Sequence, residues 1–344
     1  MEKLSEFQLL SYINQIPKAE LHIHIEGSFE PELMFEIAKR NSIDIPFSTV
    51  GELRSAYKFG DLQDFLDIYY QGASVLTKTQ DFYDLTYQYL KRAAAENIVH
   101  TEIFFDPQTH TQREVSFQTI VTGISSAMND ARADFGISSY LIMSFLRHLS
   151  EREAFEILET AKPWMNKFIG VGLDSSERGN PPEKFARVFE KCRQMNLKLM
   201  AHAGEEGPWE YVEGALDVLK VDRIDHGNRS MDNPDLLERL AQEKMPLTLC
   251  PLSNLKLKVI QKLSTHPVKT MMDKGLLVTI NSDDPAYFGG YLNKNYLETA
   301  KALNLNLEDI KLLAINSFRA SFLPQAEKDA WISKVEEFHK SFKA

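Results

Sequence analysis

The sequence predicts an α/β fold of the closed (β/α)8 barrel type, with a helical insertion after the first strand and extra helices at the C-terminal end. Eight short apolar runs rich in β-branched and aromatic residues occur along the chain. Amphipathic helical stretches separate these runs from residue 97 onward, and histidines and acids follow several of them. An open doubly wound sheet is the structural alternative, but it normally carries a glycine-rich phosphate turn after its first strand, and Glu26–Phe29 is not such a turn.

The composition is that of one folded globular unit. Of the 344 residues, 43% are hydrophobic and 26% are charged, and no stretch marks a domain boundary. We therefore expect a single barrel domain over residues 1–344, with the insertion at about residues 29–96. The formal net charge is -10 and the basic residues are scattered, so we expect no nucleic-acid partner.

The chain carries no sequence signal for export or membrane insertion. Met1–Phe7 lacks an apolar segment of signal-peptide length, and no window approaches 18 uninterrupted apolar residues. We expect a cytoplasmic protein with no membrane partner. The two cysteines, Cys192 and Cys250, lie far apart without a CxxC pair, so neither a disulfide framework nor a thiolate zinc site is predicted.

The first predicted strand, Glu20–Ile25, carries two histidines two residues apart. Because alternate residues of a strand face the same side, His22 and His24 project together while the intervening apolar residues pack behind them. One metal ion can then be bound by both imidazoles. The alternative for this pattern alone is a pair of polar residues on the solvent face of an edge strand.

A long helical region follows the first strand. Phe59, Leu62, Phe65, Leu66 and Tyr69 recur at helical spacing, and residues 82–95 repeat the pattern. The insertion is too long for a simple connection. Two interpretations stay open, a lid over a pocket and a packed helical layer, and the aromatic stripe by itself favours the layer.

The remaining strands and helices alternate regularly. The further predicted strands are Ile98–Phe105, Ser138–Phe145, Phe168–Leu173, Leu197–Ala201, Arg223–Ile224, Pro246–Leu249 and Leu276–Ile280. The helices between them are predicted at Phe117–Asp134, Glu151–Asn166, Pro182–Met195, Glu210–Leu219, Asp235–Glu243 and Pro267–Asp273. From Asn306 onward the pattern predicts terminal helices.

Four of the nine histidines fall at predicted strand ends, where a barrel carries its active site. The groups at these ends are His22-Ile23-His24, His202–Glu206, Asp225-His226-Gly227 and Ser282–Pro285. Three imidazoles and one carboxylate suit Zn²⁺ with an open position for water. His22, His24, His202 and Asp283 supply such a set.

These motifs give the chain a resemblance to the adenosine/adenine deaminase family of the amidohydrolase superfamily. The resemblance runs from Pro17–Gly27 (PKAELHIHIEG) to Ile280–Pro285 (INSDDP), which is nearly the whole chain. It implies a zinc-dependent enzyme that hydrolytically deaminates a purine amine, with zinc-bound hydroxide attacking C6 and ammonia leaving. A small-molecule substrate is the implied partner. The resemblance also implies that the insertion forms a lid, because Tyr57–Leu66 lies where this family has helices closing over the base.

The resemblance also implies a role for each matching residue. It assigns one zinc ion to His22, His24, His202 and Asp283. Glu205 matches the acid that protonates a ring nitrogen, and His226 matches the histidine beside the metal-bound water. Asp284 matches the residue that bonds N7, and Gly172 matches the backbone donor to N3. Binuclear relatives use a lysine after the fourth strand, and Gly172–Glu177 contains none, so we expect a single zinc.

Four stretches look more like the branch of the family that acts on free adenine and yields hypoxanthine, a purine-salvage reaction. They are His24–Ser28, Leu173–Phe185, Cys250–Leu257 and Asp284–Tyr291. The adenosine branch has an aspartate at the position of Glu26 and uses it on the ribose. The longer Glu26 would intrude on that space, unless it turns away to cap a helix.

Some alternatives remain at this stage. The same chemistry could act on adenosine or an N6-substituted adenine, and a more remote alternative is a catalytically silent purine-binding barrel. Iron or manganese could occupy the same ligand set. The sequence leaves open whether the chain forms a homo-oligomer, and it assigns no role to Arg147, His148 or Glu206.

Overall fold

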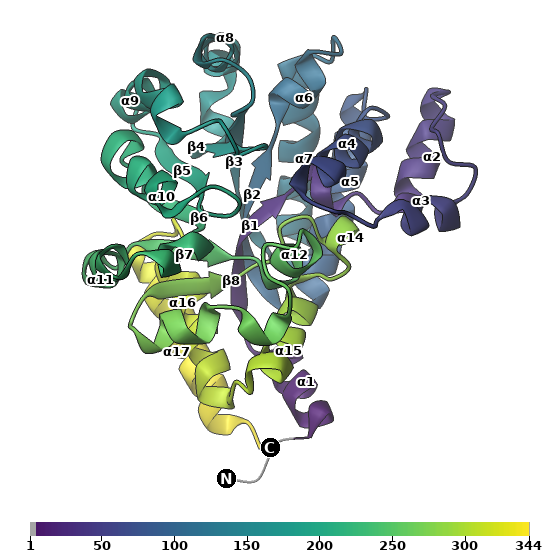
Figure 1. Ribbon diagram of the computed structural model, residues 1–344. Helices are drawn as coiled ribbons and strands as arrows, with labels where there is room; N and C mark the ends of the chain where they lie inside the picture. Colours follow the sequence, from purple (N-terminus) through teal and green to yellow (C-terminus); the bar gives the residue numbers. More distant parts are fainter. Residues whose placement is uncertain (1–4, 344) are drawn as a thin grey trace.

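The computed structural model describes residues 5–343, which form an eight-stranded parallel barrel surrounded by helices (Figure 1). The strands follow one another around the barrel in sequence order. They are β1 (Lys18–His24), β2 (Ile98–Phe105), β3 (Ser138–Leu146), β4 (Gly170–Asp174), β5 (Lys198–Ala203), β6 (Arg223–His226), β7 (Pro246–Leu249) and β8 (Leu277–Ile280). The predicted fold class is confirmed. Residues 1–4, part of the segment expected to lack a signal peptide, lie outside the described residues.

The barrel closes between its last and first strands through Asp283, three residues beyond β8. The His24 amide donates to the Asp283 carbonyl at 3.0 Å, and the Asp283 amide donates to the His22 carbonyl at 3.1 Å. An isolated parallel bridge joins Ile23 and Asp283 at the same place. The seam of the barrel therefore holds three of the predicted metal ligands side by side.

Helices cover the outside of the barrel. The helices of the N-terminal half are α1 (Glu6–Gln15), α2 (Pro31–Asn41), α3 (Val50–Ala56), α4 (Leu62–Ala73), α5 (Thr79–Ala95), α6 (Pro107–Thr111), α7 (Phe117–Phe135) and α8 (Glu151–Ala161). Those of the C-terminal half are α9 (Ala186–Gln194), α10 (Trp209–Gly214), α11 (Pro234–Glu243), α12 (Pro251–Lys256), α13 (Val268–Asp273), α14 (Pro285–Phe288), α15 (Leu292–Leu303), α16 (Leu307–Ala320) and α17 (Gln325–Ser341).

The inserted region contains α2 to α5, and these helices occupy different positions relative to the barrel. The last of them, α5, packs against α7 and β2 and so belongs to the outer layer of the barrel. Figure 1 shows α2 and α3 projecting to one side of the barrel. α4 contacts α6 and the turn at Glu26–Ser28 after β1, which brings it to the carboxyl ends of the strands.

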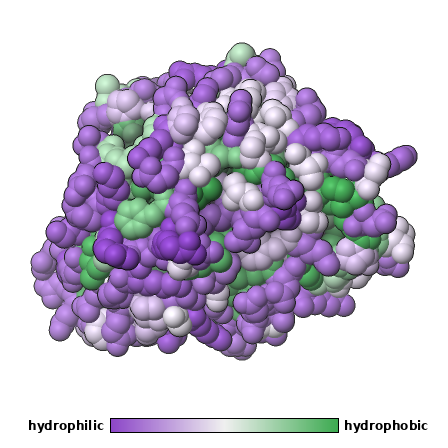
Figure 2. Space-filling model, turned by 90° about the horizontal axis from the view of Figure 1, so that it is seen from above, coloured by the Kyte–Doolittle hydropathy of each residue, from purple (hydrophilic) through white to green (hydrophobic). Residues whose placement is uncertain are grey.

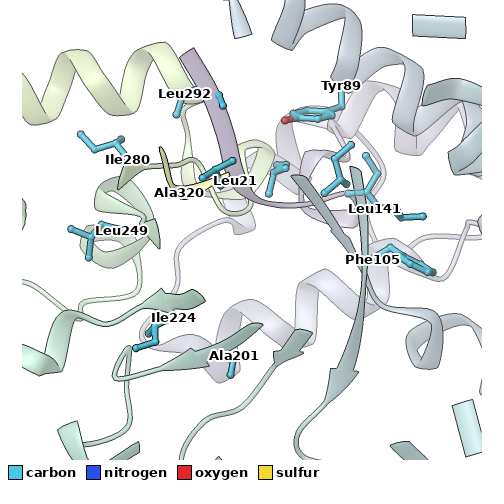
Figure 3. Packing of buried hydrophobic residues seen from close by; sticks show 14 of the residues in the cluster. Leu21, Tyr89, Phe105, Leu141, Ala201, Ile224, Leu249, Ile280, Leu292 and Ala320 are labelled. Atoms are coloured by element: carbon cyan, nitrogen blue, oxygen red, sulfur yellow. The ribbon is translucent and has the colours of Figure 1, made fainter. Parts of the chain in front are cut away.

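The core lies mainly between the strands and the helices. Residues of the strands that alternate with the inward-facing ones form this layer, and Figure 3 shows Leu21, Ala201, Ile224 and Leu249 among them. A smaller cluster of Phe104, Ile142 and Met200 belongs to the barrel interior. The two-residue period of each strand therefore sends apolar side chains outward and leaves inward positions for polar groups.

The outer surface is largely hydrophilic. Figure 2 shows one face of the molecule, on which apolar residues form separate patches among hydrophilic ones. No helix within residues 5–343 has both the length and the apolar character needed to cross a membrane.

Candidate active site

The three predicted histidine ligands and Asp283 meet at the carboxyl ends of β1, β5 and β8. His22 Nε2 lies 3.3 Å from Asp283 Oδ1, and His24 Nε2 lies 3.5 Å from the same oxygen. His24 Nε2 and His202 Nε2 are 3.2 Å apart. Donor atoms that bind one tetrahedral zinc at about 2.0–2.1 Å are separated by roughly 3.3 Å. These three separations match that spacing.

Several buried imidazole nitrogens of this cluster lack a hydrogen-bond donor, and a cation can take the place of that donor. His24 Nδ1 faces Asp174 Oδ2 at 3.5 Å, and His202 Nδ1 faces Asp225 Oδ2 at the same distance. With a proton on each Nδ1, the two Nε2 atoms turn lone pairs toward each other at 3.2 Å. Among residues 5–343, nothing donates to the buried His22 Nε2 either. A metal ion satisfies all three nitrogens, so the residues fit the ion that the family implies.

Asp225 interacts with the Nδ1 side of two of these imidazoles, with one of them through Thr248. His22 Nδ1 lies 2.9 Å from Thr248 Oγ1, and that hydroxyl donates to Asp225 Oδ1 at 3.0 Å. The other carboxylate oxygen faces His202. Asp225 thus fixes the ring orientation of His22 and His202, as outer partners of metal-binding histidines commonly do.

A second possible ligand group contains His226 in place of His24, whose ligand-type atoms lie instead within 4.8 Å of those of Asp106 and Asp174. Ligand-type atoms of His22, His202, His226 and Asp283 lie within 4.8 Å of one another. His226 Nε2 is 3.9 Å from Asp283 Oδ2 but only 3.6 Å from Glu205 Oε2. Its nitrogen therefore stands farther from Asp283 than those of His22 and His24, and it faces the catalytic acid predicted from the sequence.

Glu205 and Asp284 are buried carboxyl groups beside this cluster. Burial, followed by the negative charge of Asp283, raises the pKa of Glu205 well above its usual range. Burial and the charge of Asp283 raise the pKa of Asp284 in the same way. Burial lowers the pKa of His226, which is therefore a neutral imidazole. The site thus contains carboxyl groups that favour the protonated form and a histidine that carries a single N–H proton and no positive charge.

Two site residues have strained backbones. His226 has φ 63° and Asp283 has φ 64°, in the left-handed region that residues with a side chain rarely adopt. Each such conformation costs on the order of 1–3 kcal/mol, and it persists because the surrounding structure fixes it. Gly27 shows how tight this region is, because a Cβ at that position would lie 1.9 Å from Asp284 Oδ1.

Glu177 is a structural support of the site, although no role is predicted for it from the sequence. Its carboxylate accepts four consecutive backbone amides, from Gly204, Glu205, Glu206 and Gly207, at 2.6, 3.0, 2.8 and 2.8 Å. The loop that carries Glu205 is therefore held by one buried anion. Glu177 lies within the Leu173–Phe185 stretch that the family resemblance singled out, but its partners are 27 or more residues away in sequence.

The cluster opens into a cavity that α4 helps to enclose. The lining residues are His24, Leu62, Phe65, Leu66, Tyr69, Tyr70, Asp106, Asp174, Ser175, His202, Glu205, His226, Leu257, Asp283, Asp284 and Phe288. Five of them come from α4. The aromatic stripe of α4 therefore both packs in the core and covers the cavity.

Glu26 lies behind the cavity wall. Its Oε1 accepts hydrogen bonds from His110 Nε2 at 2.8 Å and from the Asp106 amide at 3.3 Å. Burial raises the pKa of Glu26 to about 7. Asp106 stands in front of it, and burial together with the Glu26 charge raises the pKa of Asp106 to about 7.

Gly172 lies within β4, two residues before the cavity-lining Asp174. A Cβ there would lie 3.0 Å from the Phe104 ring and from Ser144 Oγ, so a larger residue would have to displace these side chains slightly. Of the residues without a predicted role, Arg147 donates to the His202 carbonyl at 2.6 Å. His148 Nδ1 lies 2.9 Å from Ser175 Oγ, and Glu206 pairs with Arg178 at 3.6 Å.

The chain is similar to known proteins over nearly its whole length. Residues 17–338 match the profile of the family described as adenosine deaminase. The chain is 59% identical over 325 residues to an adenine deaminase of Acinetobacter baylyi, which covers 94% of this chain and 98% of that protein. It is 58% identical over 329 residues to an adenine deaminase of Ralstonia pickettii, covering 94% and 95% respectively.

Solved structures show the same similarity. An adenine deaminase from Arthrobacter aurescens superimposes with a TM-score of 0.93 at 48% identity, covering 95% of this chain and all (100%) of that one. An amidohydrolase from Burkholderia ambifaria with bound zinc gives a TM-score of 0.89 at 27% identity, covering 99% and 96%.

Proposed function

We propose that this chain, which belongs to the adenosine deaminase family, hydrolytically deaminates adenine to hypoxanthine and ammonia with the help of one zinc ion. The observation that carries the proposal is the proximity of the predicted zinc ligands, Glu205, His226 and Asp284 at one buried site, in a chain 59% identical to an adenine deaminase. Glu26 lies behind the wall of this site. The reaction belongs to purine salvage. The similarity to adenine deaminases also disfavours adenosine and N6-substituted adenines as the preferred substrates.

His22, His24, His202 and Asp283 hold the zinc ion in this proposal. Support comes from the converging nitrogens and from the zinc-bound relative that shares 27% identity. When bound, the ion supplies Lewis acidity, which makes a water molecule acidic enough to act as a nucleophile near neutral pH. The absence of lysine from Gly172–Glu177 favours one ion over two.

The remaining groups act on the purine and on the attacking water. Glu205 holds the proton that N1 receives as water adds to C6, so that the ring can accept the electron pair and C6 becomes tetrahedral. His226 Nε2 faces both Glu205 and Asp283 and holds the attacking water between them. Asp284 bonds N7. His226 takes the proton that the attacking water loses and passes it to the C6 amino group, so the C6–N bond breaks and ammonia leaves. The proton of the new C6 hydroxyl returns to Glu205 as the carbonyl of hypoxanthine forms. For Gly172 we keep the role of backbone donor to N3 as a prediction.

The first experiment measures formation of the 6-oxopurine product by the zinc-loaded protein from adenine, adenosine and N6-methyladenine at equal concentrations, because the leaving group is ammonia for the first two and methylamine for the third. We expect a kcat/KM for adenine that exceeds the other two by at least about 100-fold, because a site built for one set of polar groups rejects ligands that leave them unpaired. A preference for adenosine would contradict the substrate assignment. No 6-oxopurine product from any of the three, with metal bound, would overturn the proposed function.

Glu205→Gln tests the role of the acid. The amide retains the size of the side chain but has no proton to give N1, so kcat should fall by roughly 10²–10⁴-fold. Metal content should stay at one ion, because Glu205 is not a predicted ligand. Glu206→Gln is the matched control, since this neighbouring carboxylate points to Arg178, and its kcat should stay within a few-fold of the parent. Loss of metal in Glu205→Gln would show that the ligand set is misassigned.

A further inference from the structure

The geometry points to Asp106 as the residue that selects a free base over a nucleoside. We propose that Asp106 Oδ1 accepts a hydrogen bond from the N9–H of adenine, a hydrogen that a nucleoside lacks because its sugar is attached there. This inference rests on the proposed function, since it concerns the orientation of the same substrate in the same cavity.

Asp106 has an unused acceptor in the cavity wall. It follows β2 directly, is 3% exposed and lines the cavity. Its Oδ2 accepts the Tyr69 hydroxyl at 3.1 Å, whereas its Oδ1 has no partner in the described part of the chain. Although Asp106 is the N-cap residue of α6, its side chain makes no capping bond to that helix. A buried carboxylate oxygen left unpaired is costly, so a bound ligand is expected to supply the donor.

The order of the strands places Asp106 beside N9. Around the purine perimeter the atoms run from N1 through C6 to N7 and then to C8 and N9. The proposed partners of N1, C6 and N7 follow β5, β6 and β8, in the order Glu205, His226 and Asp284. Continuing in the same direction, β1 and β2 come next, so the residue after β2 faces the N9 end of the ring.

A second layer holds Asp106 in this position. The Asp106 amide donates to Glu26 Oε1 at 3.3 Å, and His110 Nε2 lies 2.8 Å from the same oxygen. Arg113 Nη2 donates to His110 Nδ1 at 2.8 Å, which makes Nε2 the protonated nitrogen. Glu26 is thus a support behind the wall, and Asp106 is the residue that meets the ligand.

The nearest competing acceptor is Asp174. Its Oδ1 and Oδ2 also lack hydrogen-bond partners in the described part of the chain, although Oδ2 faces His24 Nδ1 at 3.5 Å. Asp174 ends β4, however, and the same strand order places β4 beside N3, between the N9 and N1 ends of the ring. A purely structural interpretation of Asp106 is that it only anchors α4 through Tyr69. The two interpretations differ in what they predict for ligands that differ only at N9.

The test compares kcat/KM for adenine and 9-methyladenine in the zinc-loaded parent and in Asp106→Ala, Asp106→Asn and Tyr69→Phe. The parent should prefer adenine by about 10³-fold or more, because 9-methyladenine leaves Oδ1 unpaired and adds a methyl group at the wall. Asp106→Ala should lose roughly 10- to 100-fold on adenine and gain activity on 9-methyladenine, so the preference falls by at least about 100-fold. Asp106→Asn keeps the size of the side chain and should lose activity on adenine without gaining on 9-methyladenine.

Tyr69→Phe removes the bond to Oδ2 and leaves Oδ1 in place, so its preference should stay within about threefold of the parent. Bound zinc is measured in every variant and should not change. An unchanged preference in Asp106→Ala would overturn the inference. If that variant does not fold, an Asp106→Asn variant with parental kcat/KM for adenine would overturn it equally. A parent that is inactive on adenine would instead overturn the proposed function.

Discussion

At the scale of single residues, Glu177 shows how much of the site depends on a group that does not touch the reacting atoms. Four amides of the Gly204–Gly207 loop converge on its carboxylate. Charge-assisted bonds of this kind are about twice as strong as neutral ones, and a ring of amides around an anion fixes the loop conformation. The position of the Glu205 carboxyl is therefore determined by Glu177.

We predict that Glu177→Gln impairs catalysis without changing metal content. The glutamine has one acceptor oxygen and turns an amino group toward the loop amides, so the Glu205 loop should shift and kcat should fall by about 100-fold. The free energy of unfolding should drop by about 2–4 kcal/mol, measured by urea denaturation. Glu183→Gln, an exposed residue nearby, is the control and should match the parent. Parental kcat in Glu177→Gln would show that the loop holds its shape unaided.

The sequence could predict some of these residues because their signals are local. His22 and His24 share one strand face, and the acids at the end of β8 are adjacent in sequence, so strand periodicity and fold class suffice to bring them together. Glu177, Asp225 and Asp106 act on partners in other strands or loops. Their roles depend on side-chain directions across the barrel, which no local pattern contains. Only the chain's packing shows that Asp106 stands in front of Glu26.

At the scale of elements, α4 is held to the barrel by one arginine. Arg113 donates to the carbonyls of Ser74 at 2.8 Å, Ala73 at 3.1 Å and Leu76 at 3.4 Å, just where α4 ends. On the other side, Tyr70 and Ser175 are hydrogen-bonded at 2.9 Å. α4 covers the cavity, so these contacts set how firmly the cavity is closed.

Arg113→Ala should loosen α4 locally. Three carbonyls at the helix end lose a charged donor, so amide hydrogen exchange across residues 62–76 should accelerate by about 10-fold or more, while α5 and the strands exchange as in the parent. Mass-spectrometric exchange of peptides from both regions provides the measurement. Arg152→Ala, which removes an exposed arginine paired with Glu156, should leave exchange in α4 unaltered. Uniform acceleration throughout the molecule would indicate global destabilisation instead.

Element positions could be predicted well where the hydrophobic period is unbroken, as in β2 and β7, whose predicted bounds match the structure. The predicted helix Glu151–Asn166 instead divides into α8 and a 3₁₀ segment, Lys162–Lys167, because Pro163 has no amide hydrogen for the α-helical pattern. β5 and β6 extend to Ala203 and His226, past the predicted ends. Polar residues at the ends of these two strands interrupt the apolar pattern, so the predicted strands stop before them. In the barrel these residues nevertheless pair with the neighbouring strands.

At the scale of the whole molecule, the metal cluster and the closure of the barrel coincide. β8 meets β1 through the backbone of Asp283, whose side chain faces His22 and His24. Without an ion, three imidazole nitrogens and a carboxylate oxygen crowd together at this seam in the interior. An ion bound there acts as a cross-link between the first and last strands, and its free energy of binding adds to the stability of the closed barrel.

Removal of the metal should therefore lower the thermal stability of the entire barrel. A ligand present at about 1,000 times its Kd stabilises the folded state by about 4 kcal/mol, so exhaustive chelation should lower Tm by about 4–8 °C. Scanning calorimetry before and after chelation gives the measurement, and one equivalent of Zn²⁺ should restore Tm whereas Mg²⁺, which prefers oxygen ligands, should not. Asp283→Ala removes one of the proposed zinc ligands together with its negative charge, so the variant should bind zinc poorly. The Tm of this variant should therefore no longer respond to zinc. A metal-free protein with the Tm of the loaded form would mean that backbone pairing alone closes the barrel, and that the ion serves chemistry only.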